Sequence, residues 1–172
     1  MQYELETTDI SLDLFGSEKS KLIDKRITKN RETPFLLMLR AATSAKKFLL
    51  SRKARSITIF IGKGNNGEDG LCLAALLKIE NIKTHVIDLE CKSRPESQAY
   101  KLCIDLGIMI ERFNINKIPS SDWYVDGVFG IGLNRDLQGN YLRAINYLQC
   151  SQSKKILSLD LPSGLDGSKG II

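Results

Sequence analysis

The sequence predicts an α/β fold: a Rossmann-like, three-layer sandwich in which a mostly parallel sheet carries helices on both faces. Short β-branched apolar runs alternate with longer segments of helix-forming residues, which is the pattern of repeated β-α-β units. Three of these runs end in turns rich in Gly, Asn, Asp and Ser. In an open parallel sheet such turns meet at one edge, where ligands bind.

The 172 residues predict a single domain, with residues 1–16 as an arm. No apolar run approaches the length of a membrane span, and the acidic start Met1–Glu6 lacks the features of a signal peptide. The net charge of +5 comes from scattered Lys and Arg residues. Such scatter is more typical of a solvated surface than of a nucleic-acid site, so the sequence disfavours RNA as a partner.

The cysteine pattern predicts reduced thiols and a cytoplasmic protein. Cys72, Cys91, Cys103 and Cys150 form no C-x-x-C pair and no zinc spacing. Cys72 and Cys103 lie among apolar residues in helix-like segments, as small buried side chains do. The single histidine, His85, lies in a strand-like segment without a His or Cys neighbour and is a poor candidate for a metal ligand.

The individual elements follow from local periodicity and turn residues. The expected helices span, in chain order, about 17–29, 34–48, 71–77, 95–106 and 140–150. Pro34 suits the first turn of its helix because its missing N–H needs no partner there. The expected strands are 56–61, 83–89, 108–110, 123–125 and 156–159. The continuous apolar run 56–61 is typical of a central strand that is covered on both faces.

The first polar turn follows strand 56–61. Gly62, Gly64 and Gly67 match the spacing of the dinucleotide fingerprint, and Asp88 comes 21 residues after Gly67, where an acid can bind a ribose hydroxyl. On this match alone the sequence would predict an NAD-dependent oxidoreductase. A bare fingerprint is nevertheless a weak signal.

The acids inside this turn argue against an ordinary dinucleotide cradle. Glu68 and Asp69 place two carboxylates where a pyrophosphate would rest, and like charges repel. Both acids also suit the first turn of a helix, so simple capping is the alternative. The chain further lacks a Tyr-x-x-x-Lys or His dyad suited to hydride transfer.

The second and third turns carry further oxygen groups. Asp126 and Asp160 each emerge where a strand ends, and Ser163 offers a hydroxyl and a carbonyl. The glycines of 127–132 allow backbone N–H groups to approach an anion, and Arg135 suits a phosphate. Carboxylate, amide and hydroxyl oxygens without Cys or His partners suit a hard cation. Either aspartate is also a candidate for proton transfer.

Three segments, in order and spacing, resemble the NAD(P)H-hydrate epimerase family, the YjeF N-terminal domain: Gly64–Gly70, Val125–Leu133 and Leu159–Asp166. The resemblance covers about residues 20 to 170. It implies an isomerase of Rossmann-like fold that interconverts the R and S epimers of hydrated NADH and NADPH in nicotinamide nucleotide repair. It also implies a homodimer, a potassium ion in the site, and a dehydratase domain or partner.

The resemblance assigns residues by motif. It implies that Asn66, Asp126 and Ser163 hold potassium. We hypothesise that Asp126 transfers protons, with Asp160 as the second candidate. The residues that the resemblance places around the hydrated nucleotide are Asn65, Asn66, Gly67, Glu68, Asp69, Gly130, Ile131, Gly132, Leu133, Asn134, Arg135, Asp136 and Asp160.

This chain departs from the family pattern in three places, the first of which is the opening-helix motif, where Leu39 and Ala42 stand in place of the usual Glu and Gly. The family usually has Gly-Gly-Asp where Gly67-Glu68-Asp69 stands here, so Glu68 is expected either to strain a positive-φ position or to reach toward the substrate. The family also continues beyond the third motif, so we expect a missing C-terminal part or an edge strand covered by a partner.

The alternative function is a non-catalytic binding or scaffold module with a nucleotide or RNA ligand. Such a module has no need to keep Asn66, Asp126, Asp160 and Ser163 together, and their joint presence favours the epimerase.

Overall fold

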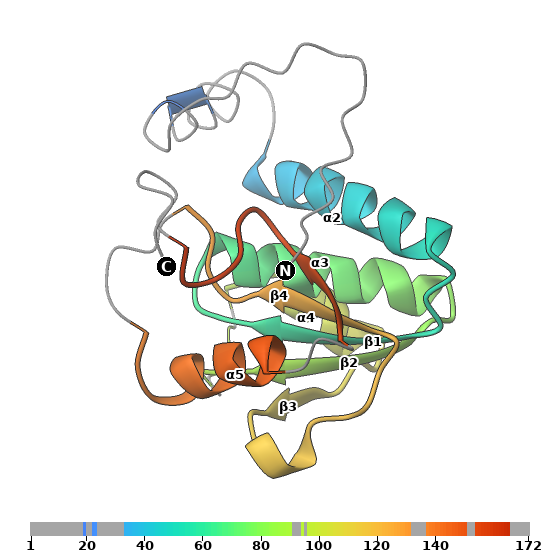
Figure 1. The fold of residues 1–172 in the computed structure, drawn as a ribbon. Coiled ribbons are helices and arrows are strands. Elements are labelled where there is room, and N and C mark those ends of the chain that lie inside the picture. Colours follow the sequence, from blue (N-terminus) through green and yellow to red (C-terminus); the bar gives the residue numbers. More distant parts are fainter. Residues whose placement is uncertain are drawn as a thin grey trace, which may run out of the picture.

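The computed structural model describes residues 19, 22–23, 33–90, 94, 96–131, 137–150 and 154–165. In this part of the chain one sheet contains five parallel strands in the order β3-β2-β1-β4-β5 (Figure 1). The strands are β1 (Ser56–Ile61), β2 (Lys83–Asp88), β3 (Ile110–Arg112), β4 (Trp123–Gly127) and β5 (Lys155–Ser158). The predicted α/β class is confirmed.

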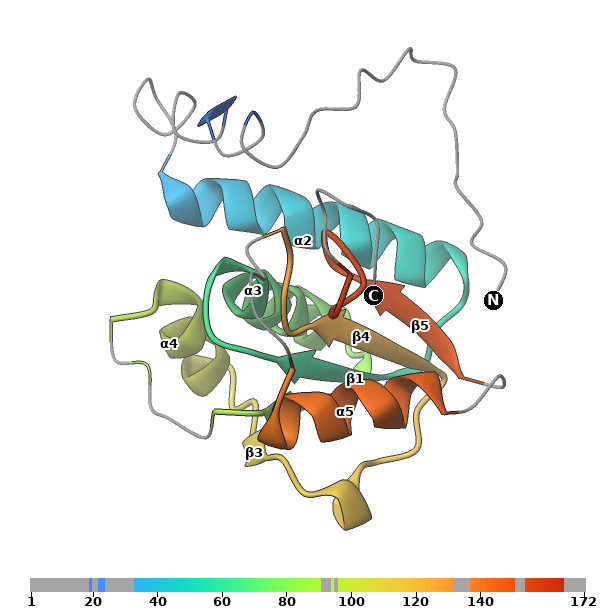
Figure 2. The ribbon, with the colours of Figure 1, turned by 60° about the vertical axis from the view of Figure 1, so that its left-hand side comes forward.

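Helices cover both faces of the sheet (Figure 2). On one face lie α2 (Pro34–Ser51), α3 (Asn65–Ile79) and α4 (Gln98–Asp105), while α5 (Gly139–Gln149) lies on the other. A short 3₁₀ helix, η1 (Ile115–Lys117), follows β3. The described helices and the sheet thus form the three layers that the sequence predicts.

Strand β1 divides the core in two because its side chains alternate between the faces. Ile57, Ile59 and Ile61 are buried in the cluster formed with α2, α3 and α4. Phe60 is buried in the cluster formed with α5. A strand covered on both faces needs apolar side chains on both, which explains the nearly continuous apolar run in the sequence.

Two helix starts show how the sequence fixes local structure. Helix α2 begins at Pro34, and the Oγ1 of its N-cap Thr33 accepts a hydrogen bond from the Leu36 N–H at 3.4 Å. Helix α3 begins at Asn65, six residues earlier than the apolar pattern predicts. Its N-cap Gly64 has φ 107° and ψ −169°, a conformation that is essentially restricted to glycine.

Two strand boundaries differ from the expected ones. The strand expected at 108–110 starts only at Ile110, because the backbone of Gly107 and Ile108 closes the end of α4. The Gly107 N–H donates to the Ile104 carbonyl, and the Ile108 N–H donates to the Cys103 carbonyl. Strand β4 extends past Asp126, which is therefore paired within the sheet rather than placed after it.

The strand order reverses between β1 and β4, and we call the region outside the carboxyl ends of these strands the crevice. The chain leaves β1 toward α3 on one face and leaves β4 toward α5 on the other. The strand ends are level, since Ile61 pairs with both Asp88 of β2 and Gly127 of β4. Ligands bind at such a switch point, outside the carboxyl ends of the strands.

We predict that Ile59→Ala lowers the free energy of unfolding by about 2–5 kcal/mol, because it leaves a cavity between β1 and α3. The matched control is Ile104→Ala on α4, where the side chain is 51% exposed, and here we expect a change below about 0.5 kcal/mol. Chemical denaturation measures both values. Equal losses in the two variants would contradict the described core.

Candidate functional site

The turns after β1 and β4 touch through their backbones. A Cβ added at Gly62 would lie 2.4 Å from the carbonyl oxygen of Val128. A Cβ at Gly67 would lie 2.1 Å from the carbonyl oxygen of Gly62. Neither gap admits a side chain. Gly62 therefore allows the turn after β1 to touch the loop after β4, and Gly67 allows the first turn of α3 to pack against Gly62.

Asn66, in that first helical turn, holds the two segments together. Its side chain is buried, and its Nδ2 donates to the Phe129 carbonyl at 2.8 Å. Its Oδ1 is buried without a hydrogen-bond partner among the described residues. Leaving a buried acceptor unsatisfied costs free energy, so the oxygen is a natural position for a ligand.

Asp126 and Ser163 form a buried pair between β4 and the turn after β5. The Ser163 hydroxyl donates to Asp126 Oδ1 at 2.6 Å, and the Ser163 N–H donates to Oδ2 at 2.7 Å. The Val128 N–H adds a third hydrogen bond to Oδ1 at 3.2 Å. Burial raises the pKa of Asp126 above its ordinary value, while the hydrogen bonds from Ser163 and Val128 act in the opposite direction.

The peptide groups of Phe129 join all three motifs. The Phe129 N–H donates to Ser163 Oγ at 2.8 Å, and the Phe129 carbonyl accepts from Asn66 and lies 3.2 Å from Ser163 Oγ. Sequence reasoning did not single out Phe129, because its contribution comes from the backbone and any residue type carries that. The signal that could have found it is its position between the glycines of the second motif.

Asp160 lies at the exposed rim of the same site. Its Oδ2 accepts a hydrogen bond from the Ile131 N–H at 2.8 Å, and its own φ is +69°. A Cβ at Gly130 would lie 2.1 Å from that same oxygen. Gly130 is thus required for the carboxylate of Asp160 to reach the loop.

The structure brings together Asn66, Asp126 and Ser163, with Asp160 beside them through Ile131. Asn65 is exposed at the start of α3. The sequence-predicted nucleotide contacts Gly132, Leu133, Asn134, Arg135 and Asp136 lie outside the described residues.

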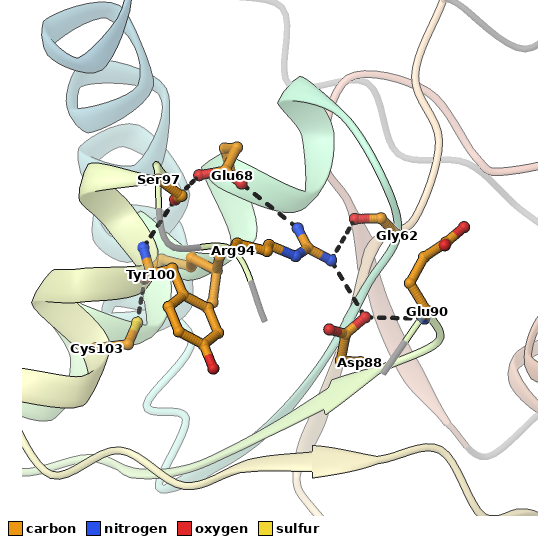
Figure 3. A network of polar contacts seen from close by, with 9 residues as sticks. Gly62, Glu68, Asp88, Glu90, Arg94, Ser97, Tyr100 and Cys103 are labelled. Atoms are coloured by element: carbon orange, nitrogen blue, oxygen red, sulfur yellow. Dashed lines mark hydrogen bonds and ion pairs between the residues drawn. The ribbon is translucent and has the colours of Figure 1, made fainter. Parts of the chain in front are cut away.

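Glu68 does not take the first of the two courses expected from the sequence, a strained backbone with positive φ. It lies inside α3 and is absent from the described non-glycine residues with positive φ, so its backbone is not strained there. Its side chain turns toward α4, where it accepts a hydrogen bond from the Ser97 hydroxyl and pairs with Arg94 at 3.5 Å (Figure 3). The carboxylate of Glu68 is therefore held at the edge of the crevice.

Asp88 is held in the same network. Its carboxylate is 4% exposed and accepts from Arg94 Nη2 at 3.1 Å and from the Glu90 N–H at 2.9 Å. The carboxylate is thus already bonded and almost fully buried, which leaves little of it open to a ribose hydroxyl. The oxidoreductase interpretation, which needs Asp88 open to a ribose, does not fit this arrangement. Arg94 itself was missed by sequence reasoning because no motif contains it.

Taken together, the features define a class: a doubly wound α/β protein whose switch-point crevice is lined with amide, carboxylate and hydroxyl oxygens. Residues 35–172 match the sequence profile of the family described as YjeF-related protein N-terminus. The chain belongs to this family.

Two curated relatives are each 32% identical to this chain. The bifunctional NAD(P)H-hydrate repair enzyme of Dictyoglomus turgidum aligns over 94% of the chain and 33% of its own length. The NAD(P)H-hydrate epimerase of Levilactobacillus brevis aligns over 80% of the chain and 65% of its own length. The chain thus spans less than two thirds of either relative.

A solved structure shows the same fold. The crystal structure of the yeast protein ynu0 matches with a TM-score of 0.82 at 22% identity, over 94% of this chain and 75% of that one. Within the described residues, no helix is long and apolar enough to cross a membrane.

We predict that Ser163→Ala lowers the free energy of unfolding by about 1–3 kcal/mol, because Asp126 loses a buried donor and the Phe129 N–H loses its acceptor. The control is Ser44→Ala on α2, whose exposed hydroxyl bonds only its own helix, with an expected change below about 0.5 kcal/mol. Urea denaturation compares the two. A similar small effect at both positions would mean that the buried pair does not organise the site.

Proposed function

We propose that this chain interconverts the R and S epimers of hydrated NADH and NADPH. The observation that carries the proposal is the meeting of Asn66, Asp126 and Ser163 around the Phe129 peptide groups at the switch point. The names of the curated relatives, both concerned with NAD(P)H-hydrate, support the substrate class. The proposal retains residues 65–69, 130–136 and Asp160 as the lining of the nucleotide.

The residues present fit a potassium ion. Asn66 Oδ1 is a buried oxygen without a hydrogen-bond partner in the described part of the chain, and both Asp126 and Ser163 contact the loop of Val128 and Phe129 that Asn66 also contacts. Hard cations prefer such a set of oxygens. We assign Asn66, Asp126 and Ser163 to the cation, which when bound supplies positive charge beside the oxygens of the nucleotide.

The geometry supports different roles for the two aspartates. Asp126 is 4% exposed, and both of its oxygens already accept hydrogen bonds. Asp160 is exposed, and its Oδ1 makes no hydrogen bond to any described residue. A general acid or base must reach the proton that it transfers. We therefore propose Asp160 for proton transfer and Asp126 for organising the site, which reverses the order hypothesised from the sequence.

The reaction needs one proton to be given to the leaving hydroxyl and one proton to be taken from the water that adds. The hydroxyl at C6 of the reduced nicotinamide ring leaves as water when the Asp160 carboxyl protonates its oxygen, and the ring nitrogen's electron pair stabilises the resulting iminium carbon. Water then adds to the opposite face of C6, and the Asp160 carboxylate takes back the released proton. The net result is inversion at C6, with Asp160 restored.

Further assignments belong to the same proposal. A dehydratase domain or partner would use the epimer that this reaction supplies, and the relative named bifunctional supports that pairing. A homodimer and a cytoplasmic location stay predictions from the sequence.

We predict that Asp160→Asn lowers kcat for epimerisation at least about 100-fold, because the amide cannot transfer the proton yet can still accept from the Ile131 N–H. Chromatography of the two epimers, starting from the R epimer of hydrated NADH in potassium and then in sodium, measures the rate. The control Asp105→Asn, at the exposed end of α4, keeps the full rate.

Two outcomes would count against parts of this proposal. A wild-type rate no higher than the spontaneous one would favour the non-catalytic binding module instead. Full activity in Asp160→Asn together with loss of activity in a folded Asp126→Asn would return the proton-transfer role to Asp126.

A further inference from the structure

Arg94 lies directly against the glycine turn, between two acids. Its Nη2 donates to the Gly62 carbonyl at 2.9 Å and to Asp88 at 3.1 Å, and its Nη1 lies 3.5 Å from the Glu68 carboxylate (Figure 3). The side chain is 13% exposed. A Cβ at Gly67 would lie 3.2 Å from Nη1, so the guanidinium rests against the start of α3.

A hydrogen bond to α4 holds the Glu68 carboxylate beside the turn. The Ser97 hydroxyl, at the N-cap of α4, donates to Glu68 Oε2 and also accepts from the Tyr100 N–H at 2.9 Å. Ser97 thereby fixes Glu68 close to the residues that we assign to the nucleotide. The negative charge of Glu68 is thus held beside the turn by a contact that does not involve Arg94.

That charge opposes the proposed substrate. Hydrated NADH and NADPH carry a pyrophosphate, and the first turn of a helix is a favourable place for such an anion only when no fixed carboxylate competes. Glu68 and Asp88 would each repel it over several ångströms. Among the described residues, Arg94 forms ion pairs with both carboxylates.

We propose that Arg94 is a positioning residue that keeps the crevice accessible to an anionic nucleotide by neutralising Glu68 and Asp88. This inference rests on the proposed function. The ion pair with Arg94 explains how the chain accommodates the Glu68 carboxylate, which by itself would repel the pyrophosphate. Arg94 acts through the acids that it pairs with, so it lowers the KM for the nucleotide and leaves the chemical step largely unchanged.

The test compares Arg94→Gln, Arg94→Lys, Glu68→Gln and the double variant Arg94→Gln/Glu68→Gln. The matched control is Arg55→Gln, which makes the same charge change just before β1, at the opposite end of that strand. KM and kcat for hydrated NADH are measured at constant potassium, with tetramethylammonium chloride used to vary ionic strength. Calorimetry with NADH, which has the same pyrophosphate, gives binding without turnover.

We expect Arg94→Gln to raise KM about tenfold at low salt, with kcat within about threefold of wild type and a smaller effect at high salt. Arg94→Lys, which keeps the charge, and the double variant, which removes the opposing charge, should both restore KM to within about threefold. Glu68→Gln alone should lower KM, so the proposal stays testable even where Arg94→Gln does not fold. Arg55→Gln should match wild type.

Other results would overturn the inference. A double variant or a lysine variant as impaired as Arg94→Gln, at all salt concentrations, would show that Arg94 acts only through its forked hydrogen bonds to the turn. If the wild-type protein converts hydrated NADH and all variants have the same KM, the inference about Arg94 is wrong while the proposed function stands. If the wild-type protein binds NADH but does not convert hydrated NADH, the proposed function is wrong. The inference about Arg94 then depends on whether the NADH affinities of the variants differ from that of the wild type as expected for KM. If it neither turns over nor binds, both fail.

Discussion

The site depends on how closely the turns after β1 and β4 approach each other. Gly62 allows its backbone to contact that of Val128, and Gly67 allows its backbone to contact that of Gly62; a side chain at either position would prevent the contact. That contact lets Asn66 reach the Phe129 carbonyl, while Ser163 reaches the Phe129 N–H from the third turn. Three segments far apart in the sequence are therefore held together by the peptide groups of one loop residue.

Burial and hydrogen bonding then place the two aspartates in different environments. Asp126 accepts hydrogen bonds from Ser163 and Val128, and burial raises its pKa, whereas Asp160 is exposed and bonded to the Ile131 N–H. On the neighbouring side of the crevice, Arg94 joins the ends of β1 and β2 to the first turn of α3. Arg94 thus offsets the negative charge of two carboxylates, Glu68 and Asp88.

Much of the fold could be predicted from the sequence because its signals are local. Strand β1 and the start of α2 at Pro34 lie where the apolar run and the proline place them. The boundaries that shifted, at the start of α3 and of β3, depend on backbone hydrogen bonds and on Gly64 and Gly107, whose φ angles are positive. Hydrophobic periodicity carries no information about those angles.

The sequence by itself determined the fold class, the edge at which the polar turns gather, and most residue types of the site, because strand and turn preferences act over a few residues. Only the tertiary structure decided what those residues contact. Phe129 contributes peptide groups that every residue has, and Arg94 comes from a segment without a motif. Whether a carboxylate is buried, bridged or open depends on what the rest of the chain packs against it.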